Sequence, residues 1–137
     1  MSQSLSKPPA DAEALVYHAE LGSVRQFVTA KARQAGLPPN RVKDLVIAVN
    51  ELAANTLAHT SGPGTLMMWV TADEIICQVH DNGQITDVHA GQFRPQPDQL
   101  GGGRGLWVVR LICDLVEIRT GEDGTTIRAH MRRGLPE

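Results

Sequence analysis

Residues 38–59 read PPNRVKDLVIAVNELAANTLAH, and their pattern is the strongest indication of the fold in this sequence. Two prolines open it, and proline is tolerated in the first turn of a helix because the N–H that it lacks would have no partner there. Apolar residues then recur at steps of three and four and form one continuous face; they are Val42, Leu45, Val46, Val49, Leu52 and Ala53. The pattern predicts a long amphipathic helix over a hydrophobic core, ended by the glycines and proline of residues 61–64.

The segments on both sides of this helix have strand or helix patterns of their own. Strands are expected over 14–19, 65–71, 74–80, 114–120 and 125–131, and further helices over 22–35 and 106–113. The predicted fold class is α+β, a two-layer sandwich in which a mixed, mostly antiparallel sheet is covered on one face by three helices.

Composition narrows the classes of protein. The chain has 137 residues, a 42% hydrophobic fraction and a net charge of −2, which fit one globular domain. We expect a disordered tail over 1–13 and the domain over 14–133. No basic run indicates nucleic acid, and no apolar run is long enough for a membrane. The separated cysteines, Cys77 and Cys113, predict buried thiols in a reducing, cytoplasmic location.

The central helix also carries a polar stripe. Glu51, Asn55 and His59 are four residues apart, so they lie on one side of the helix, away from the apolar face. The stripe could be solvated surface. The alternative is a functional site, because an amide oxygen is a hard ligand for a divalent cation and a carboxylate can accept a proton.

Two turn-like segments allow a second pair of interpretations. Asp81-Asn82-Gly83 follows a strand and is either an ordinary turn or a carboxylate that accepts a hydrogen bond from the amine of adenine. Residues 100–106, LGGGRGL, run directly into a helix. They form either a flexible linker or a phosphate-binding helix start, in which backbone N–H groups and Arg104 face an anion. Gly124-Thr125-Thr126 is compatible with a plain hairpin turn.

The order of these features resembles the GHKL ATPase family, which includes gyrase and the histidine kinases. The similarity covers about residues 14–132: Glu-x3-Asn-x3-His on a helix, Asp-x-Gly after a strand, a loop, a Gly-x-Gly helix start and a final Gly-Thr. Within that family the chain looks most like the small serine/threonine kinases that act as bacterial anti-sigma factors. The resemblance implies the Bergerat ATP-binding fold.

It also implies roles for individual residues. Glu51 would be the catalytic base and Asn55 the ligand of Mg²⁺. Asp81 and Gly83 would bind adenine, with Thr126 near Asp81. Gly103, Arg104, Gly105 and Leu106 would bind the phosphates of ATP. Arg25 would contact a protein partner. The expected partners are a STAS-type anti-sigma-factor antagonist, whose serine is phosphorylated, a sigma factor and a second copy of the chain.

One position departs from the family pattern. The adenine motif is usually Asp-x-Gly-x-Gly, but Ile85 replaces the second glycine. This substitution favours nucleotide binding over efficient turnover. The alternative function is therefore a catalytically weak module that binds a sigma factor or an antagonist in a nucleotide-dependent way. A histidine kinase fragment is a further alternative. The remaining histidines have no metal-ligand spacing and are expected to be structural.

Overall fold

The computed structural model describes residues 5–59, 63–83 and 104–134. Eight elements follow in the order β1 (Glu13–Tyr17), α1 (Gly22–Gln34), α2 (Pro39–His59), β2 (Gly64–Val70), β3 (Glu74–Asp81), α3 (Arg104–Ile112), β4 (Leu115–Gly121) and β5 (Gly124–Arg132). The predicted elements are present, with ends shifted by one or two residues. Along the described part of the chain, no helix combines the length and the apolar composition needed to cross a membrane.

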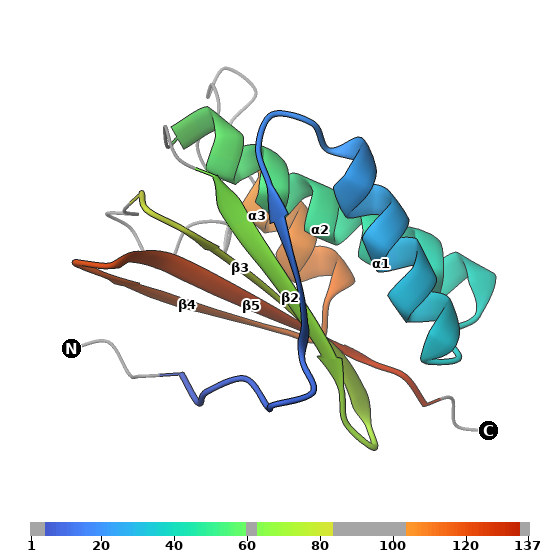
Figure 1. Ribbon diagram of the computed structural model, residues 1–137. Coiled ribbons are helices and arrows are strands. Elements are labelled where there is room, and N and C mark those ends of the chain that lie inside the picture. The colour runs from blue at the N-terminus through green and yellow to red at the C-terminus, as the bar shows by residue number, and fades with distance from the viewer. Residues whose placement is uncertain (1–4, 60–62, 84–103, 135–137) are drawn as a thin grey trace.

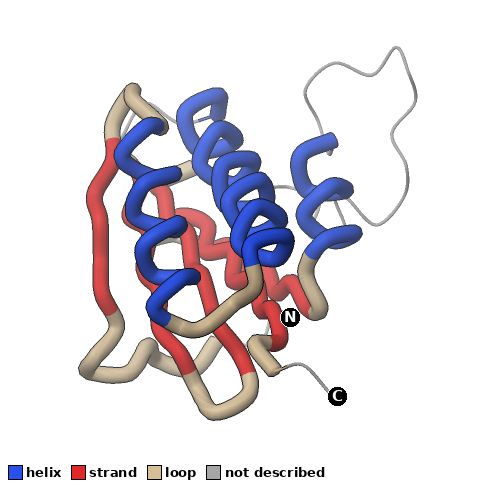
Figure 2. The backbone as a smooth tube through the Cα atoms, turned by 90° about the vertical axis from the view of Figure 1, so that its right-hand side faces the viewer, coloured by secondary structure: helices blue, strands red, loops and turns tan. Residues whose placement is uncertain are grey.

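The five strands form one sheet in the order β1-β2-β3-β5-β4, and each neighbouring pair is antiparallel. All three helices lie on the same face of this sheet (Figures 1 and 2). This is the two-layer α+β sandwich that the sequence predicts. β3 lies in the middle and pairs with β2 and β5, and its last residue, Asp81, is held by its pairing with Thr125 of β5.

The core lies between α2 and the sheet. Leu45, Val49 and Leu52 of α2 are at most 1% exposed, and they cluster with Ile75 and Val79 of β3. Complete burial of such side chains contributes about 1.5–3 kcal/mol each. The core therefore fixes the rotation of α2, and with it the side on which Glu51 and Asn55 lie.

The opposite face of the sheet has a polar layer, and none of the helices in the described residues covers it (Figures 1 and 2). Arg128 is only 4% exposed, and its guanidinium lies 5.0 Å from the Trp69 ring. It donates to Gln78 Oε1 at 2.6 and 3.0 Å, and to Ser6 O at 2.6 Å and Ser6 Oγ at 3.0 Å. The segment before β1 therefore crosses this face and is anchored to it through Ser6 (Figure 1).

Candidate functional site

The polar stripe of α2 is only half-buried where the helix meets α3. Glu51 and Asn55 are both partly exposed, whereas Leu52 and Ala53 between them are buried in the core. The helical spacing places the carboxylate and the amide one turn apart on the same side. The side chain of His59, the third member of the predicted stripe, lies outside the described residues.

Gly105, in the first turn of α3, packs against Glu51 of this stripe. A Cβ built on Gly105 would lie 3.0 Å from Glu51 Oε1 and 3.8 Å from the Glu51 carbonyl oxygen. Glycine at this position lets the two helices approach closely. The first turn of a helix presents free backbone N–H groups and the positive end of the helix dipole. The structure thus brings the Glu51 carboxylate and an anion-attracting helix start together.

Asp81 is fixed at the end of β3 by two donors. Gly83 N donates to Asp81 Oδ1 at 2.8 Å, and Thr56 Oγ1 of α2 donates to Asp81 Oδ2 at 3.0 Å. Thr56 is one residue after Asn55, so α2 contributes to both ends of the candidate site. A half-buried carboxylate held in this way keeps unused lone pairs for a further donor.

The start of β5 closes the site from the other side of β3. Gly124 has a φ of +113°, and a Cβ there would lie 1.9 Å from the Asp81 carbonyl oxygen. Only glycine allows this approach. Thr125 pairs with Asp81 in the sheet register, and its hydroxyl donates to Gly83 O at 2.8 Å.

This register corrects the predicted position of Thr126. Side chains alternate between the two faces of a strand, so Thr126 lies on the face opposite Asp81. It pairs with His80, and its hydroxyl lies 2.8 Å from His80 Nδ1. The threonine beside Asp81 and Gly83 is therefore Thr125.

Other predicted site residues have varied positions. Leu106 is 3% exposed and its side chain belongs to the core, so only its backbone could face a phosphate. Gly103 and Ile85 lie outside the described residues, as does the side chain of Arg104. Arg25 is exposed on α1, and its Nη1 donates to Asn50 Oδ1 at 3.0 Å. Asn50 directly precedes Glu51, so Arg25 lies near this end of the site.

The donor set suits Mg²⁺ bound together with a phosphate ligand. Asn55 supplies an amide oxygen, and Glu51 supplies a carboxylate one turn away. In the described part of the chain, no three His, Cys, Asp or Glu side chains form a metal site. Mg²⁺ commonly takes only one or two protein ligands and completes its octahedron with water and substrate phosphates. Asn55 is thus a suitable ligand for the ion when a nucleotide is present.

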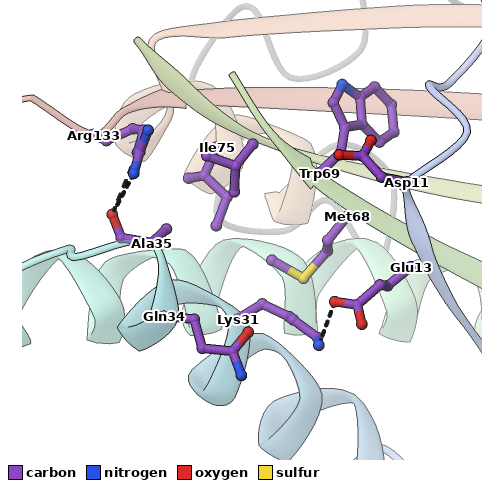
Figure 3. Close-up of a pocket in the computed structure, with 10 residues that line it drawn as sticks. Asp11, Glu13, Lys31, Gln34, Ala35, Met68, Trp69, Ile75 and Arg133 are labelled. Atoms are coloured by element: carbon purple, nitrogen blue, oxygen red, sulfur yellow. Dashed lines mark hydrogen bonds and ion pairs between the residues drawn. The ribbon is translucent and has the colours of Figure 1, made fainter. Parts of the chain in front are cut away.

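A separate cavity of about 270 Å³ lies at the other end of the sheet, next to the β2–β3 turn (Figure 3). Two of its charged residues already have partners: Lys31 forms an ion pair with Glu13, and Arg133 Nη2 donates to Ala35 O at 3.0 Å. Among the predicted site residues that the structure describes, none lines it. It is therefore distinct from the candidate nucleotide site.

Comparison with known proteins gives the class of this site. The profile of the histidine kinase-like ATPase domain matches residues 16–131, which is most of the chain. The chain belongs to the histidine kinase-like ATPase domain family. No match was found among curated proteins. As a histidine kinase-like ATPase domain, the chain is an ATP-binding, ATP-using protein. Along α2, Glu51 meets Gly105 of α3, and Thr56 binds Asp81 of β3.

Three residues that surround Asp81 and Gly83 in this ATPase domain were not predicted from the sequence as site residues. Thr56, Thr125 and Tyr17 join the hydrogen-bond network of Asp81 and Gly83. For Thr56 the sequence contains one signal of a functional role. Threonine is unfavourable in a helix interior, and its position directly after Asn55 indicates that its hydroxyl has a partner. Tyr17 gave none, because its contact with Thr56 spans 39 residues.

Proposed function

We propose that this ATPase domain is a serine/threonine kinase that phosphorylates a serine of an anti-sigma-factor antagonist and also sequesters a sigma factor. The observation that supports phosphoryl transfer is the close approach of Gly105 to Glu51. A Cβ built on Gly105 would lie 3.0 Å from Glu51 Oε1. A base beside a phosphate-binding helix is what transfer to a hydroxyl requires.

Each residue has a defined task in this reaction. Glu51 accepts the proton of the serine hydroxyl. The serine oxygen forms a bond to the γ-phosphorus while the bond between the γ-phosphorus and the oxygen that bridges it to the β-phosphorus breaks, so that ADP leaves. The backbone amides at the start of α3 stabilise the transferred group. Asn55 holds Mg²⁺, which neutralises charge on the phosphates. Asp81 accepts the hydrogen bond of the adenine amine, and Gly83 lies beside the base.

The proposal is tested by phosphate transfer from γ-labelled ATP to candidate STAS-type antagonists. Glu51→Gln should reduce transfer by about 10²–10⁴-fold, the usual contribution of a general base, while ATP affinity stays within about twofold. Glu20→Gln is the matched control, since Glu20 is exposed in the loop before α1. Equal transfer by wild type and Glu51→Gln would exclude Glu51 as the base.

A second candidate function is a nucleotide-dependent binding module without turnover. Ile85, in place of the second glycine of the adenine motif, favours it. Measuring ATP affinity and hydrolysis on the same preparation separates the two functions. A binding module would bind ATP and capture its partner but form no phosphoserine on any antagonist tested.

We further propose that Arg25 contacts the sigma factor or the antagonist in the cytoplasm. Its exposure and its hydrogen bond to Asn50 support a position at the rim of the ATP site. Arg25→Ala should weaken ATP-dependent capture of the partner about tenfold without changing ATP affinity. Arg33→Ala, an exposed residue of the same helix, is the control. Sedimentation of the wild type with and without ATP tests the proposed homodimer.

A further inference from the structure

A chain of two hydroxyl groups connects the edge strand β1 to the carboxylate of Asp81. Tyr17 Oη donates to Thr56 Oγ1 at 3.0 Å, and Thr56 Oγ1 lies 3.0 Å from Asp81 Oδ2. Tyr17 is 1% exposed and Thr56 is 2% exposed, so water does not replace these contacts. The three groups lie on β1, α2 and β3, which are brought together only by the fold.

The direction of the chain follows from the number of protons. Burial raises the pKa of Tyr17 to about 12, so its hydroxyl remains a donor at neutral pH. Thr56 accepts this bond and has one proton of its own to donate. Its two possible acceptors are Asp81 Oδ2 at 3.0 Å and Leu52 O at 3.4 Å. The shorter distance and the negative charge favour Asp81.

The backbone around Tyr17 is built to hold this ring. Gly64 pairs with Tyr17 across β1 and β2, and a Cβ on Gly64 would lie 2.3 Å from the phenol ring and its oxygen. Any other residue at 64 would therefore displace the hydroxyl from Thr56. The glycine that starts β2 thus provides the space that the Tyr17–Thr56 contact needs.

These donors give Asp81 a fixed orientation and polarity. Gly83 N occupies Oδ1 and Thr56 occupies Oδ2, so the carboxylate cannot rotate without losing a bond. An ionised carboxylate is a hydrogen-bond acceptor only. It can accept a hydrogen bond from the exocyclic amine of adenine. The carbonyl of guanine in the same place is also an acceptor, so no hydrogen bond would form and the carboxylate would lose its partner.

We propose that Tyr17 and Thr56 are positioning residues that set the preference of this site for adenine over guanine by holding Asp81 as a pure hydrogen-bond acceptor. This inference rests on the proposed role of Asp81 in base recognition. Removing the Thr56 hydroxyl frees the Oδ2 side. Asp81 can then rotate out of the orientation in which it accepts the adenine amine, a contact on which guanine does not depend.

The test is titration of the full chain with MgATP and with MgGTP. Thr56→Val keeps the shape and removes the hydroxyl. It should weaken ATP binding about tenfold and leave GTP binding unchanged, so that the ATP:GTP affinity ratio falls about tenfold. Thr56→Ser should restore the ratio, and Tyr17→Phe should lower it by a smaller factor. Thr29→Val is the matched control, because the Thr29 hydroxyl also donates to the carbonyl four residues earlier in its helix, at 2.8 Å, but Thr29 lies on α1 and is partly exposed.

Each variant is titrated at a temperature at which circular dichroism shows it to be fully folded. An unchanged ATP:GTP ratio in Thr56→Val, or an equal loss for both nucleotides, would overturn the inference, since a merely structural role does not discriminate between bases. Asp81→Asn distinguishes the role of Asp81 in nucleotide binding from the positioning role of Tyr17 and Thr56. If wild type binds ATP and Asp81→Asn does not, the site assignment stands whatever Thr56 does. If wild type binds no ATP, the proposed function itself fails.

Discussion

The backbone of Gly105 lies directly against the carboxylate of Glu51, and a single added methyl group would come within 3.0 Å of Glu51 Oε1. This contact joins the first turn of α3 to the middle of α2. It explains why a glycine occupies a helix position at which alanine would ordinarily be more stable by about 1 kcal/mol. The close approach, rather than backbone flexibility, is what Gly105 provides.

Gly105→Ala should therefore separate catalysis from folding. The obstacle is the end of a flexible side chain, so we expect the carboxylate to shift and the free energy of unfolding to change by less than about 1 kcal/mol. A small displacement of a reacting group should lower phosphoryl transfer about tenfold. Transfer assays beside urea denaturation measure both effects. Gly22→Ala is the control, because its Cβ would meet only Arg25 Nη2, at 3.9 Å; equal rates for the two variants would contradict the prediction.

Gly124→Ala should damage both the fold and the site. Its positive φ and the 1.9 Å approach to Asp81 O leave no room for a side chain. We expect a loss of about 2–4 kcal/mol in the free energy of unfolding, since strain and a backbone clash combine, together with weaker ATP binding. Gly121→Ala, at the other end of the same turn, would make only an ordinary contact of 3.5 Å with Asp123 Oδ1. Similar urea midpoints for both variants would refute this account.

Arg128→Ala should lower the free energy of unfolding without changing the affinity for ATP. The change removes every donor that Arg128 gives to Gln78 and Ser6, and it uncovers Trp69. Hydrogen bonds from a charged donor are worth about 1.5–3 kcal/mol, so we expect a loss of roughly 2–3 kcal/mol. Arg119→Ala, which removes an exposed ion pair with Asp123, should cost under about 0.5 kcal/mol. Guanidinium denaturation followed by tryptophan fluorescence measures both, and altered ATP affinity in Arg128→Ala would contradict the separation of the two faces.

Stability should fall in alkali. Burial raises the pKa of Cys113 from 9.0 and of Tyr17 from 10.0, each to about 12. In both cases the unfolded chain loses the proton first, so the folded state binds more protons above pH 9 and stability decreases as pH rises. Burial also raises the pKa of Cys77 well above 9.0, so the loss should begin above pH 9 with the two thiols and steepen above pH 10 with the phenol. Urea midpoints at pH 8, 9, 10 and 11 measure it. Tyr17→Phe should be less sensitive above pH 10; the same slope in that variant would exclude the contribution of the phenol.

Local patterns in the sequence were sufficient to predict the helices and strands of this protein and the order of its candidate site residues. The apolar period of three and four residues specified α2 and placed Glu51 and Asn55 on its opposite side, because helical geometry is local and regular. Glycines and prolines marked the turns for the same local reason. The order of Glu51, Asn55, Asp81 and the glycine-rich helix start was sufficient to predict the ATPase family, which the profile match confirms.

Which side chains contact each other depends on strand register and helix packing, and these are visible only in the folded chain. The register of β3 against β5 placed Thr125, not Thr126, beside Asp81, and a shift of one residue would reverse the two faces. The Tyr17–Thr56 and Gly105–Glu51 contacts join residues 39 and 54 positions apart, respectively. No local pattern encodes such contacts, because they depend on how the packed core sets the rotation of α2 against β1 and α3. Glu51 and Asp81 could therefore be predicted from the sequence. Their contacts with Gly105 and Thr56, respectively, depend on how α2 packs in the fold.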